Sequence, residues 1–487
     1  MNRLAAAALA FVLLLSLPVG RAFARPLAEL ADSLLSCEPL LGSSHSVLIY
    51  SLDRGSVVYE SGADRLLTPA SVTKLLTSAA ALDGLGSDFC FTTLYYAGGD
   101  ASTDGVLDGD LIVIAGGDCA AEVKADDSLR APLLRAVADS LMAHGLREVR
   151  GDIVVRTWPY RLEGAAPAWE IGDVNGGFAP AVDGFGFNSN VCHLQVMPAE
   201  SAAAAPTYIL DPPFAPLHIR SEVVTAGAGT APWIDLQFHP MDTSVTLSGE
   251  IALDDDGEFL WVPMQDPARY FGCALQDALV KRGVVVRGRI VVDRSSLPLS
   301  DSAVLLYAHR SQSLSAYLAL MNKESDNYTA EYVARALAVS ASGTGERRAG
   351  LNAIGRFLNR IGISKREFFL ADASGLARQN EVSARALVTL LCAMRAHPAG
   401  ETFIASLSMS GKDGTLQYRL SGEGLAGSVH AKTGTIGGVS ALAGYATNPQ
   451  GETFAFAMLF NHVRTSQTFV HSVQDRILES LLLGPSE

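Results

Sequence analysis

The sequence predicts an α/β (α+β) fold: an antiparallel sheet flanked by helices, formed from both ends of the chain, with a β-rich insertion between them. Strand patterns occur near the start of the chain, in residues 46–61, and again near its end, in residues 430–460. From residue 303 onward, helical spacing of apolar residues precedes the last strands. Residues 96–302 instead hold short strands with many glycines and prolines. Strands at both ends therefore indicate one shared sheet, and the middle is an insertion.

The first 24 residues have the pattern of a signal peptide. Arg3 supplies the positive end, an apolar run follows it, and small residues around Ala24 form a cleavage site. We therefore expect an exported, periplasmic protein whose mature chain begins at Arg25. No later segment has the roughly 18 uninterrupted apolar residues of a membrane span. We expect no transmembrane anchor and at most peripheral membrane association.

The N-terminal part, residues 25–95, is predicted to hold a helix, a β-hairpin and a second helix. The hairpin turns at Gly55, and because a two-stranded piece is unstable alone it must join a larger sheet. The second helix has the sequence PASVTKLLTSAAAL. We expect Thr68 to be its N-cap and Pro69 its first helical residue.

The insertion is predicted to be mostly β structure, interrupted by one helix over residues 266–283 that a strand over residues 284–292 follows at once. Its other expected strands lie within residues 109–117, 151–157, 205–219 and 244–262. In the C-terminal part we expect helices within residues 311–324, 327–341, 350–362, 383–397 and 470–483, and strands within residues 430–447 and 451–460.

Composition excludes several classes of partner and ligand. The chain has 37 basic and 51 acidic residues, and loss of the two arginines of the signal peptide takes the formal net charge from −14 to −16. This charge argues against nucleic acid as a partner. The sequence has no H-E-x-x-H motif, and the acidic run LDDDGEF lacks the alternating oxygen ligands of a calcium loop. We expect no metal and no cofactor.

Two further properties stay open at this level. The six cysteines are widely scattered without C-x-x-C spacing, so we expect mainly buried thiols and leave the number of disulfide bridges undecided. No pattern in the sequence indicates an oligomeric state.

Ser71 and Lys74 lie three positions apart at the start of the apolar helix. Residues i and i+3 share a helix face, so the two side chains can meet. Apolar neighbours would desolvate the lysine and favour its neutral amine, which beside a hydroxyl is a general base beside a nucleophile. An ordinary helix with a snorkelling lysine is the alternative, since one S-x-x-K is expected by chance roughly half the time.

Two more motifs strengthen the catalytic interpretation. An S-x-N triplet occurs at residues 325–327, and a K-T-G triplet at residues 432–434, each once in the chain. In isolation the first triplet could be a helix cap and the second an edge-strand turn. The order S-x-x-K, S-x-N, K-T-G is typical of serine β-lactamases and penicillin-binding proteins.

The S-x-N triplet and the lysine of K-T-G suit the transfer of protons and the holding of a peptide. Ser325 can relay a proton toward a leaving amine, and the amide of Asn327 can hold a substrate peptide group. Lys432 maintains a positive field in the cleft.

The rest of the K-T-G strand suits substrate and oxyanion binding. Thr433 can bind a substrate carboxylate, and Gly434 lets the backbone approach an acyl group closely. The N–H of Thr435 could form a two-donor oxyanion hole with the N–H of Ser71.

The chain resembles D-alanyl-D-alanine carboxypeptidase/endopeptidases of the penicillin-binding protein 4 type. The resemblance covers nearly all of the mature sequence, including the stretches PASVTKLLTSAAAL, MNKESDNYTAE, DASGLAR, KDGTLQYRL and AKTGTIGGVSALAGY, and segments of the insertion such as GDVNGGFAPAVDGFGFN. It implies a transpeptidase-like catalytic domain of residues 25–95 and 303–487. A second domain, residues 96–186 and 266–302, and a third, residues 187–265, are implied as nested insertions.

The resemblance also bears on single residues. The group often has glycine where Ala373 stands and a hydroxyl residue where Ala377 stands, so we interpret Asp372, Ser374 and Arg378 as loop structure near the cleft and not as catalysts. The group places an acidic residue of the inserted domain near the active site. Asp173 matches it best, although a solvated loop aspartate fits equally well.

The resulting hypothesis is an exported serine D-alanyl-D-alanine carboxypeptidase, or DD-endopeptidase, that hydrolyses peptidoglycan stem peptides through an acyl-enzyme on Ser71 and is acylated by β-lactams. Its catalytic residues would be Ser71, Lys74 and Ser325. A serine β-lactamase is the nearest alternative, but the long insertion and the lack of an identifiable deacylating glutamate disfavour it. A non-catalytic peptidoglycan-binding scaffold is the alternative from another class, and three intact motifs argue against it.

Overall fold

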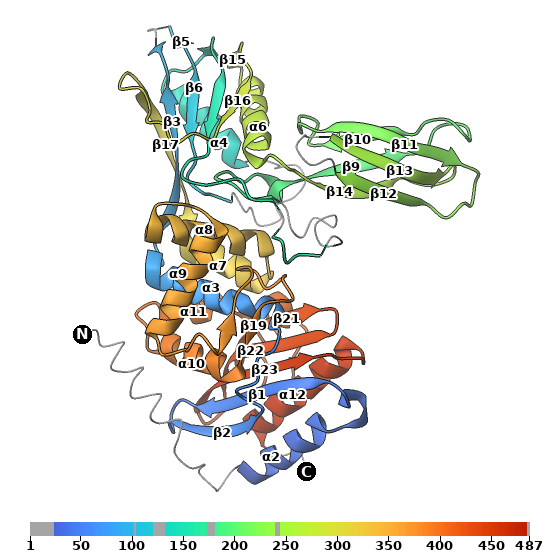
Figure 1. The fold of residues 1–487 in the computed structure, drawn as a ribbon, viewed down its shortest axis with the longest axis vertical. Coiled ribbons are helices and arrows are strands. Elements are labelled where there is room, and N and C mark those ends of the chain that lie inside the picture. The colour runs from blue at the N-terminus through green and yellow to red at the C-terminus, as the bar shows by residue number, and fades with distance from the viewer. Residues whose placement is uncertain are drawn as a thin grey trace. The chain divides into compact units, whose positions relative to one another are not determined.

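The computed structural model describes residues 24–484 except 102–103, 120–131, 165, 171, 173–180 and 239–243 (Figure 1). The predicted signal peptide therefore lies outside the described residues, apart from Ala24. The chain divides into two compact units. The terminal unit comprises the chain up to Phe89, residues 312–342 and residues 347–487, and the inserted unit comprises residues 90–311 and 343–346. Among the described residues, no helix is long and apolar enough to cross a membrane.

The terminal unit is built on a six-stranded antiparallel sheet in the order β2-β1-β23-β22-β21-β20. Its strands are β1 (Ser44–Ser51), β2 (Ser56–Ser61), β20 (Ser408–Met409), β21 (Val429–Ile436), β22 (Val439–Thr447) and β23 (Thr453–Asn461). The N-terminal hairpin joins the C-terminal strands through β1, which pairs along its whole length with β23. In Figure 1 the blue hairpin accordingly lies beside the red strands. The predicted sheet shared by both ends of the chain is confirmed.

Helices cover both faces of this sheet. The helices of the terminal unit are α2 (Ala24–Leu35), α3 (Lys74–Leu85), α7 (Leu314–Lys323), α8 (Asn327–Ser342), α9 (Arg347–Arg360), α10 (Ala384–Arg395), α11 (Gly400–Ala405) and α12 (Gln467–Leu483). Alternate residues of β23 enter different core clusters, because successive strand side chains point to opposite faces. Phe456 packs in the cluster with α2 and α12, whereas Ala457 packs in the cluster with α3, α8 and α10. A short two-stranded ribbon, β18 (Phe368–Phe369) with β19 (Glu381–Val382), completes the unit.

The start of the helix that carries Ser71 differs from the prediction. A 3₁₀ turn, η2 (Ala70–Thr73), precedes α3, and the hydroxyl of Thr68 donates to the Arg378 carbonyl at 2.9 Å. Thr68 is therefore not a helix cap and Pro69 is not the first helical residue, so both expectations are wrong. A tertiary contact of Thr68 replaces the local cap that the sequence pattern suggested.

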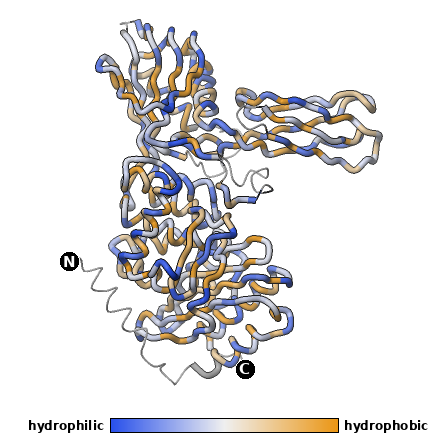
Figure 2. Tube along the Cα trace, in the orientation of Figure 1, coloured by the Kyte–Doolittle hydropathy of each residue, from blue (hydrophilic) through white to orange (hydrophobic). Residues whose placement is uncertain are grey.

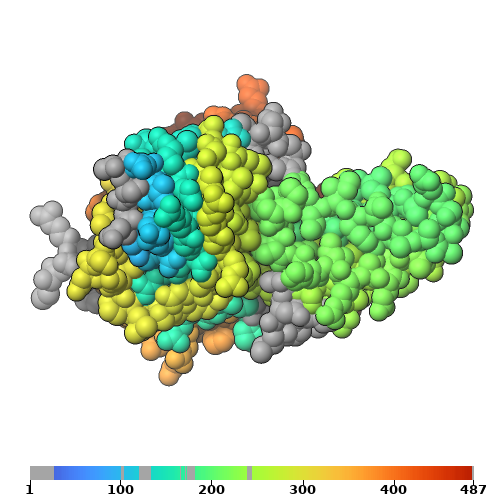
Figure 3. Space-filling model, turned by 90° about the horizontal axis from the view of Figure 1, so that it is seen from above, coloured from blue at the N-terminus to red at the C-terminus, as the bar shows by residue number. Residues whose placement is uncertain are grey.

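The inserted unit contains a five-stranded sheet in the order β16-β8-β6-β3-β17 and a four-stranded sheet in the order β15-β7-β5-β4. The strands are β3 (Cys90–Ala97), β4 (Asp100–Ala101), β5 (Val106–Asp108), β6 (Leu111–Ile114), β7 (Glu148–Val149), β8 (Ile153–Arg156), β15 (Val285–Val286), β16 (Ile290–Asp293) and β17 (Val304–Ser313). Early and late segments of the insertion thus pair, and Figure 3 shows their cyan and yellow surfaces side by side.

Three features of the inserted unit depart from the sequence-based expectations. Helix α4 (Pro132–Ala143) accompanies the expected α6 (Pro267–Lys281), whereas one helix was predicted. The strand predicted over residues 284–292 is two strands, β15 and β16, in different sheets. The outer strands β3 and β17 neighbour each other in one sheet, so the units divide at residues 89/90 and 311/312 and not at 95/96 and 302/303.

The described strands between residues 191 and 263 form two three-stranded sheets, ordered β10-β9-β14 and β11-β13-β12. The strands are β9 (Val191–Met197), β10 (Thr207–Asp211), β11 (His218–Ala226), β12 (Trp233–Phe238), β13 (Ser244–Ala252) and β14 (Glu258–Pro263). Buried and half-buried residues alternate along β9 and β13, and hydrophobic and hydrophilic colours alternate along these strands in Figure 2. The division of the insertion into two nested domains stays a proposal.

Candidate active site

Ser71 and Lys74 meet at the junction of η2 and α3. Lys74 is the first residue of α3, and its Nζ lies 3.0 Å from the Ser71 Oγ. In a 3₁₀ turn the side chains at i and i+3 eclipse, so this local geometry brings the amine directly onto the hydroxyl. The Lys74 side chain is fully buried.

Two further acceptors surround the Lys74 amine. Its Nζ lies 2.7 Å from the Asn327 Oδ1 and 2.6 Å from the Ser374 carbonyl oxygen. Burial lowers the Lys74 pKa to about 8, against the opposing effect of the Asp372, Asp326 and Glu331 carboxylates. A pKa near 8 leaves a substantial neutral fraction of the amine near neutral pH, which a general base requires.

The S-x-N triplet forms the turn between α7 and α8. Ser325 has a φ of 61°, an uncommon conformation for a residue other than glycine. Asp326 accepts a hydrogen bond from the Thr329 N–H at 3.1 Å, so it caps α8. Ser325 and Asn327 on either side of it instead contact Lys432 and Lys74. The triplet therefore combines a helix cap with two side chains aimed at the site.

The K-T-G triplet lies on β21, next to the edge strand β20. Lys432 is fully buried, and its Nζ donates to the Ser325 Oγ and to the Thr433 carbonyl, both at 2.9 Å. Burial, and then the neighbouring ammonium of Lys74, lower the Lys432 pKa well below its usual range. The Thr433 hydroxyl donates to the Thr415 Oγ1 at 2.7 Å.

Gly434 brings β21 against the backbone of the nucleophile turn. A Cβ at this position would lie 2.5 Å from the Pro69 carbonyl oxygen and 3.1 Å from the Ser71 and Val72 nitrogens. Real Cβ atoms essentially never come within 3.0 Å of another heavy atom in this way, so only glycine fits without a shift.

The outward edge of β21 carries Thr433 and Thr435. The Val429 carbonyl accepts from the Ser410 N–H beside β20, and backbone groups alternate sides along a strand. The backbone N–H groups of Thr433 and Thr435 therefore point to the same edge of β21 as the backbone groups of Val429. Among the described strands, β20 pairs only with His430 and Ala431 on that edge. The edge beyond Ala431 can accept an extended peptide.

The Lys74 amine contacts Ser71 and Asn327, and the Lys432 amine contacts Ser325. The short triplet that holds Ser325 and Asn327 links these two groups, and Gly434 on β21 lies against the backbone of the Ser71 turn. Asp173 lies outside the described residues. In the part of the chain that the structure describes, no group of three or more His, Cys, Asp or Glu side chains could hold a metal ion.

Sequence reasoning missed the carbonyl of Ser374 as a partner of Lys74. The stretch DASGLAR was interpreted as loop structure near the cleft, and Asp372 and Ser374 are indeed fully buried there. A backbone acceptor has no side-chain signature, so no pattern of residue types could have identified it. Thr415, within KDGTLQYRL, was also missed, although the resemblance had singled out its stretch.

Comparisons with known proteins show which family this chain belongs to. The model of the D-Ala-D-Ala carboxypeptidase 3 (S13) family matches residues 27–480. A D-alanyl-D-alanine carboxypeptidase of Actinomadura sp. is 30% identical over 447 residues, which are 89% of this chain and 81% of that protein. D-alanyl-D-alanine carboxypeptidase DacB of Haemophilus influenzae is 26% identical over 428 residues, 87% of this chain and 86% of that protein.

The fold has a close match among solved structures. The crystal structure of penicillin binding protein 4 from Haemophilus influenzae superposes with a TM-score of 0.81 at 24% identity, covering 93% of this chain and 99% of that chain. The predicted fold class, the resemblance to the penicillin-binding protein 4 type and the expectation of a serine-type D-Ala-D-Ala carboxypeptidase are confirmed. The chain belongs to the D-Ala-D-Ala carboxypeptidase 3 (S13) family.

Proposed function

We propose that this protein removes the terminal D-alanine of peptidoglycan stem peptides through an acyl-enzyme on Ser71, and that β-lactams acylate the same hydroxyl. The observation that carries the proposal is the 3.0 Å contact between the Ser71 Oγ and the buried Lys74 Nζ. Membership of a D-Ala-D-Ala carboxypeptidase family supports the choice of substrate.

Acylation begins with proton transfer from the Ser71 hydroxyl to the neutral Lys74 amine. The Ser71 Oγ attacks the carbonyl carbon of the peptide bond between the two D-alanines, and the carbonyl oxygen becomes an oxyanion. The N–H groups of Ser71 and Thr435 stabilise that charge. The C–N bond then breaks, and the proton reaches the leaving amine through Ser325, which Lys432 orients.

Deacylation reverses the roles of the groups. A water molecule gives a proton to the Lys74 amine and attacks the acyl carbon, and the C–O bond to Ser71 breaks. Ser71 regains its proton, and the shortened peptide leaves with a new carboxylate. We propose that Asn327 holds a substrate amide, that Thr433 and Lys432 bind the terminal carboxylate, and that Asp173 contributes to substrate binding.

Several finer properties belong to the same proposal. We infer that a signal peptide exports the protein to the periplasm, where its substrate lies. A structure of penicillin binding protein 4 from Haemophilus influenzae holds a β-lactam, which supports acylation by this class of compound. Endopeptidase activity on cross-links uses the same attack on a different leaving group.

The test uses purified protein, a fluorescent penicillin and a pentapeptide that ends in D-Ala-D-Ala. Wild-type protein should be labelled covalently and should release D-alanine, whereas Ser71→Ala should do neither while melting at the wild-type temperature. Ser36→Ala, which removes an exposed serine of the same unit, is the matched control and should behave as wild type. Undiminished labelling of Ser71→Ala would refute the assignment.

Two readouts separate related activities. A penicilloyl adduct that persists for minutes indicates a carboxypeptidase, and turnover within milliseconds would indicate a β-lactamase. Mass analysis of products from cross-linked muropeptides shows whether cross-links are cleaved. Failure to hydrolyse either peptide, with intact labelling, would overturn the proposed substrate.

A further inference from the structure

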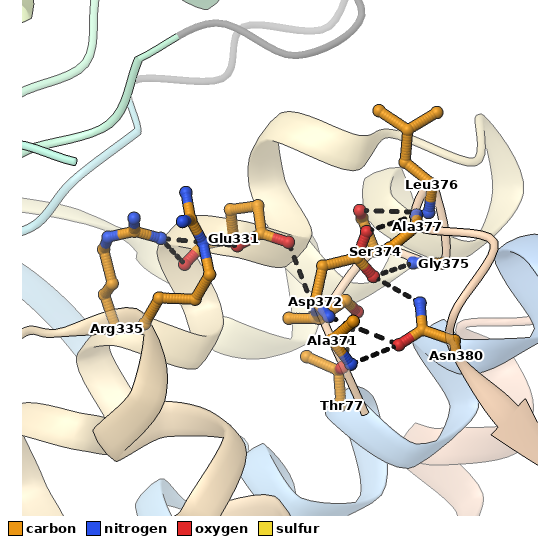
Figure 4. A network of polar contacts seen from close by, with 12 residues as sticks. Thr77, Glu331, Arg335, Ala371, Asp372, Ser374, Gly375, Leu376, Ala377 and Asn380 are labelled. Carbon is orange, nitrogen blue, oxygen red and sulfur yellow. Dashed lines mark hydrogen bonds and ion pairs between the residues drawn. The ribbon is translucent and has the colours of Figure 1, made fainter. Parts of the chain in front are cut away.

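The loop of residues 371–380, here called the Asp372 loop, is held by one buried carboxylate. The Asp372 Oδ1 accepts from the Gly375 N–H at 2.7 Å and from the Asn380 Nδ2 at 2.6 Å. Its Oδ2 accepts from the Ala377 N–H at 2.6 Å. The Asn380 Oδ1 in turn accepts from the Ala371 and Asp372 N–H groups, as Figure 4 shows. The carboxylate therefore fixes the curvature of the loop from within.

Helices α3 and α8 clamp the same loop from outside. The Thr77 hydroxyl of α3 donates to the Ala373 carbonyl at 2.7 Å, and the Glu331 Oε1 of α8 accepts from the Ala373 N–H at 3.0 Å. The other oxygen of Glu331 lies 3.4 Å from Arg335, which Figure 4 labels beside it. The same oxygen lies 3.6 Å from Arg347. Both polar groups of the residue before Ser374 are thus bonded to helices of the core.

This clamping fixes the direction of the Ser374 carbonyl, which lies 2.6 Å from the Lys74 Nζ. A neutral amine has two N–H donors and one lone pair. The Ser374 carbonyl and the Asn327 Oδ1 can only accept, so they take the two N–H groups. Of the three partners, only the Ser71 hydroxyl can donate, and the lone pair is left facing it.

We propose that the Asp372 loop sets the direction of the Lys74 lone pair, and that Asp372 is a positioning residue for the activation of Ser71. This inference depends on the proposed function, because it assigns a role within the same acylation step. Asp372 acts through the Ser374 carbonyl and touches neither the nucleophile nor the substrate in this account.

The charge of Asp372 adds a measurable signature. The ionisable groups that face Lys74 are Asp372 in the loop, Asp326 and Glu331 at α8, and Lys432 on β21. The three carboxylates raise the Lys74 pKa, and burial lowers it. Removal of the Asp372 charge should therefore lower the Lys74 pKa further. The acylation rate rises with pH as Lys74 loses its proton, and this rising part of the pH profile, here called the acidic limb, should move to lower pH.

The experiment measures the second-order rate constant of acylation by a fluorescent penicillin between about pH 5 and about pH 10. Asp372→Asn should acylate roughly 100-fold more slowly on the alkaline plateau, as expected when a reacting group is misplaced by about 1 Å. Its acidic limb should lie at lower pH than that of wild type. Asp64→Asn, which removes an exposed carboxylate of the same unit, is the control and should change neither quantity.

Thr77→Val tests the geometry without a change of charge. It removes the hydrogen bond to the Ala373 carbonyl and should slow acylation roughly tenfold with an unmoved acidic limb. If the thermal melt shows that Asp372→Asn does not fold, the acylation rate of Thr77→Val alone tests whether the loop positions Lys74.

Two results would overturn the proposal: a wild-type acylation rate in a folded Asp372→Asn or in Thr77→Val, or an unmoved acidic limb in a folded Asp372→Asn. Because the stability of a folded protein changes with pH, the thermal melt of each variant is recorded across the same pH range, and rates are compared only where the variant is folded. Failure of the proposed function is recognised separately, because Ser71→Ala would then still be labelled.

Discussion

Replacement of Gly434 by alanine tests the contact between β21 and the nucleophile turn. The added Cβ would lie 2.5 Å from the Pro69 carbonyl oxygen and 3.1 Å from the Ser71 and Val72 nitrogens. Ordinary contacts begin at 3.4 Å, and all three atoms are backbone, so strand and turn must separate by about 1 Å. A displacement of that size at reacting groups costs about 100-fold in rate, or about 2.7 kcal/mol in the barrier.

The assay is the second-order rate constant of acylation by a fluorescent penicillin, together with thermal melting. We expect Gly434→Ala to lose about 100-fold in acylation and about 1–3 kcal/mol in stability through overpacking. Gly355→Ala is the matched control, since its Cβ would meet only the Phe368 ring, at 3.6 Å, on a helix that favours alanine. Acylation of Gly434→Ala at the rate of Gly355→Ala would refute this reasoning.

The remaining predictions concern pH, stability and substrate binding. Acylation should rise as the pH increases through the Lys74 pKa of about 8, because the amine acts as a base only when it is neutral; a rate that falls over that range would contradict the assignment. Arg335→Met should lower the free energy of unfolding by about 3 kcal/mol, since it breaks a buried pair with Glu331, and chemical denaturation measures this. Thr433→Val should raise KM for a D-Ala-D-Ala peptide about tenfold with little change in kcat, as the loss of one substrate hydrogen bond predicts. A change in kcat alone would argue against a binding role.

The sequence was most informative where a function depends on local spacing. The contact of Ser71 with Lys74 could be predicted because residues three positions apart share one face of a helix. The meeting of Lys74 with Asn327, and of Ser325 with Lys432, required recognition of the motif order, because no local pattern specifies contacts between such distant segments. The sheet shared by both ends of the chain followed from the unpaired N-terminal hairpin, which needed a partner such as β23.

Features that depend on tertiary contacts could not be predicted. Thr68 had the residue type of a helix cap but donates instead to the Arg378 carbonyl. The expected catalytic domain extends to residue 95 and so includes most of β3, but the place of β3 in the inserted sheet depends on neighbours in that sheet such as β6 and β17. The role of the Ser374 carbonyl depends on backbone direction, which the Asp372 carboxylate and two helices fix together.

The most direct test of the account is the location of the covalent adduct. Wild-type protein is incubated with benzylpenicillin, digested and mapped by mass spectrometry. The account predicts a penicilloyl group on Ser71 alone, within the peptide that also contains Lys74. An adduct on Ser325 or on any other residue, with Ser71 unmodified, would contradict it.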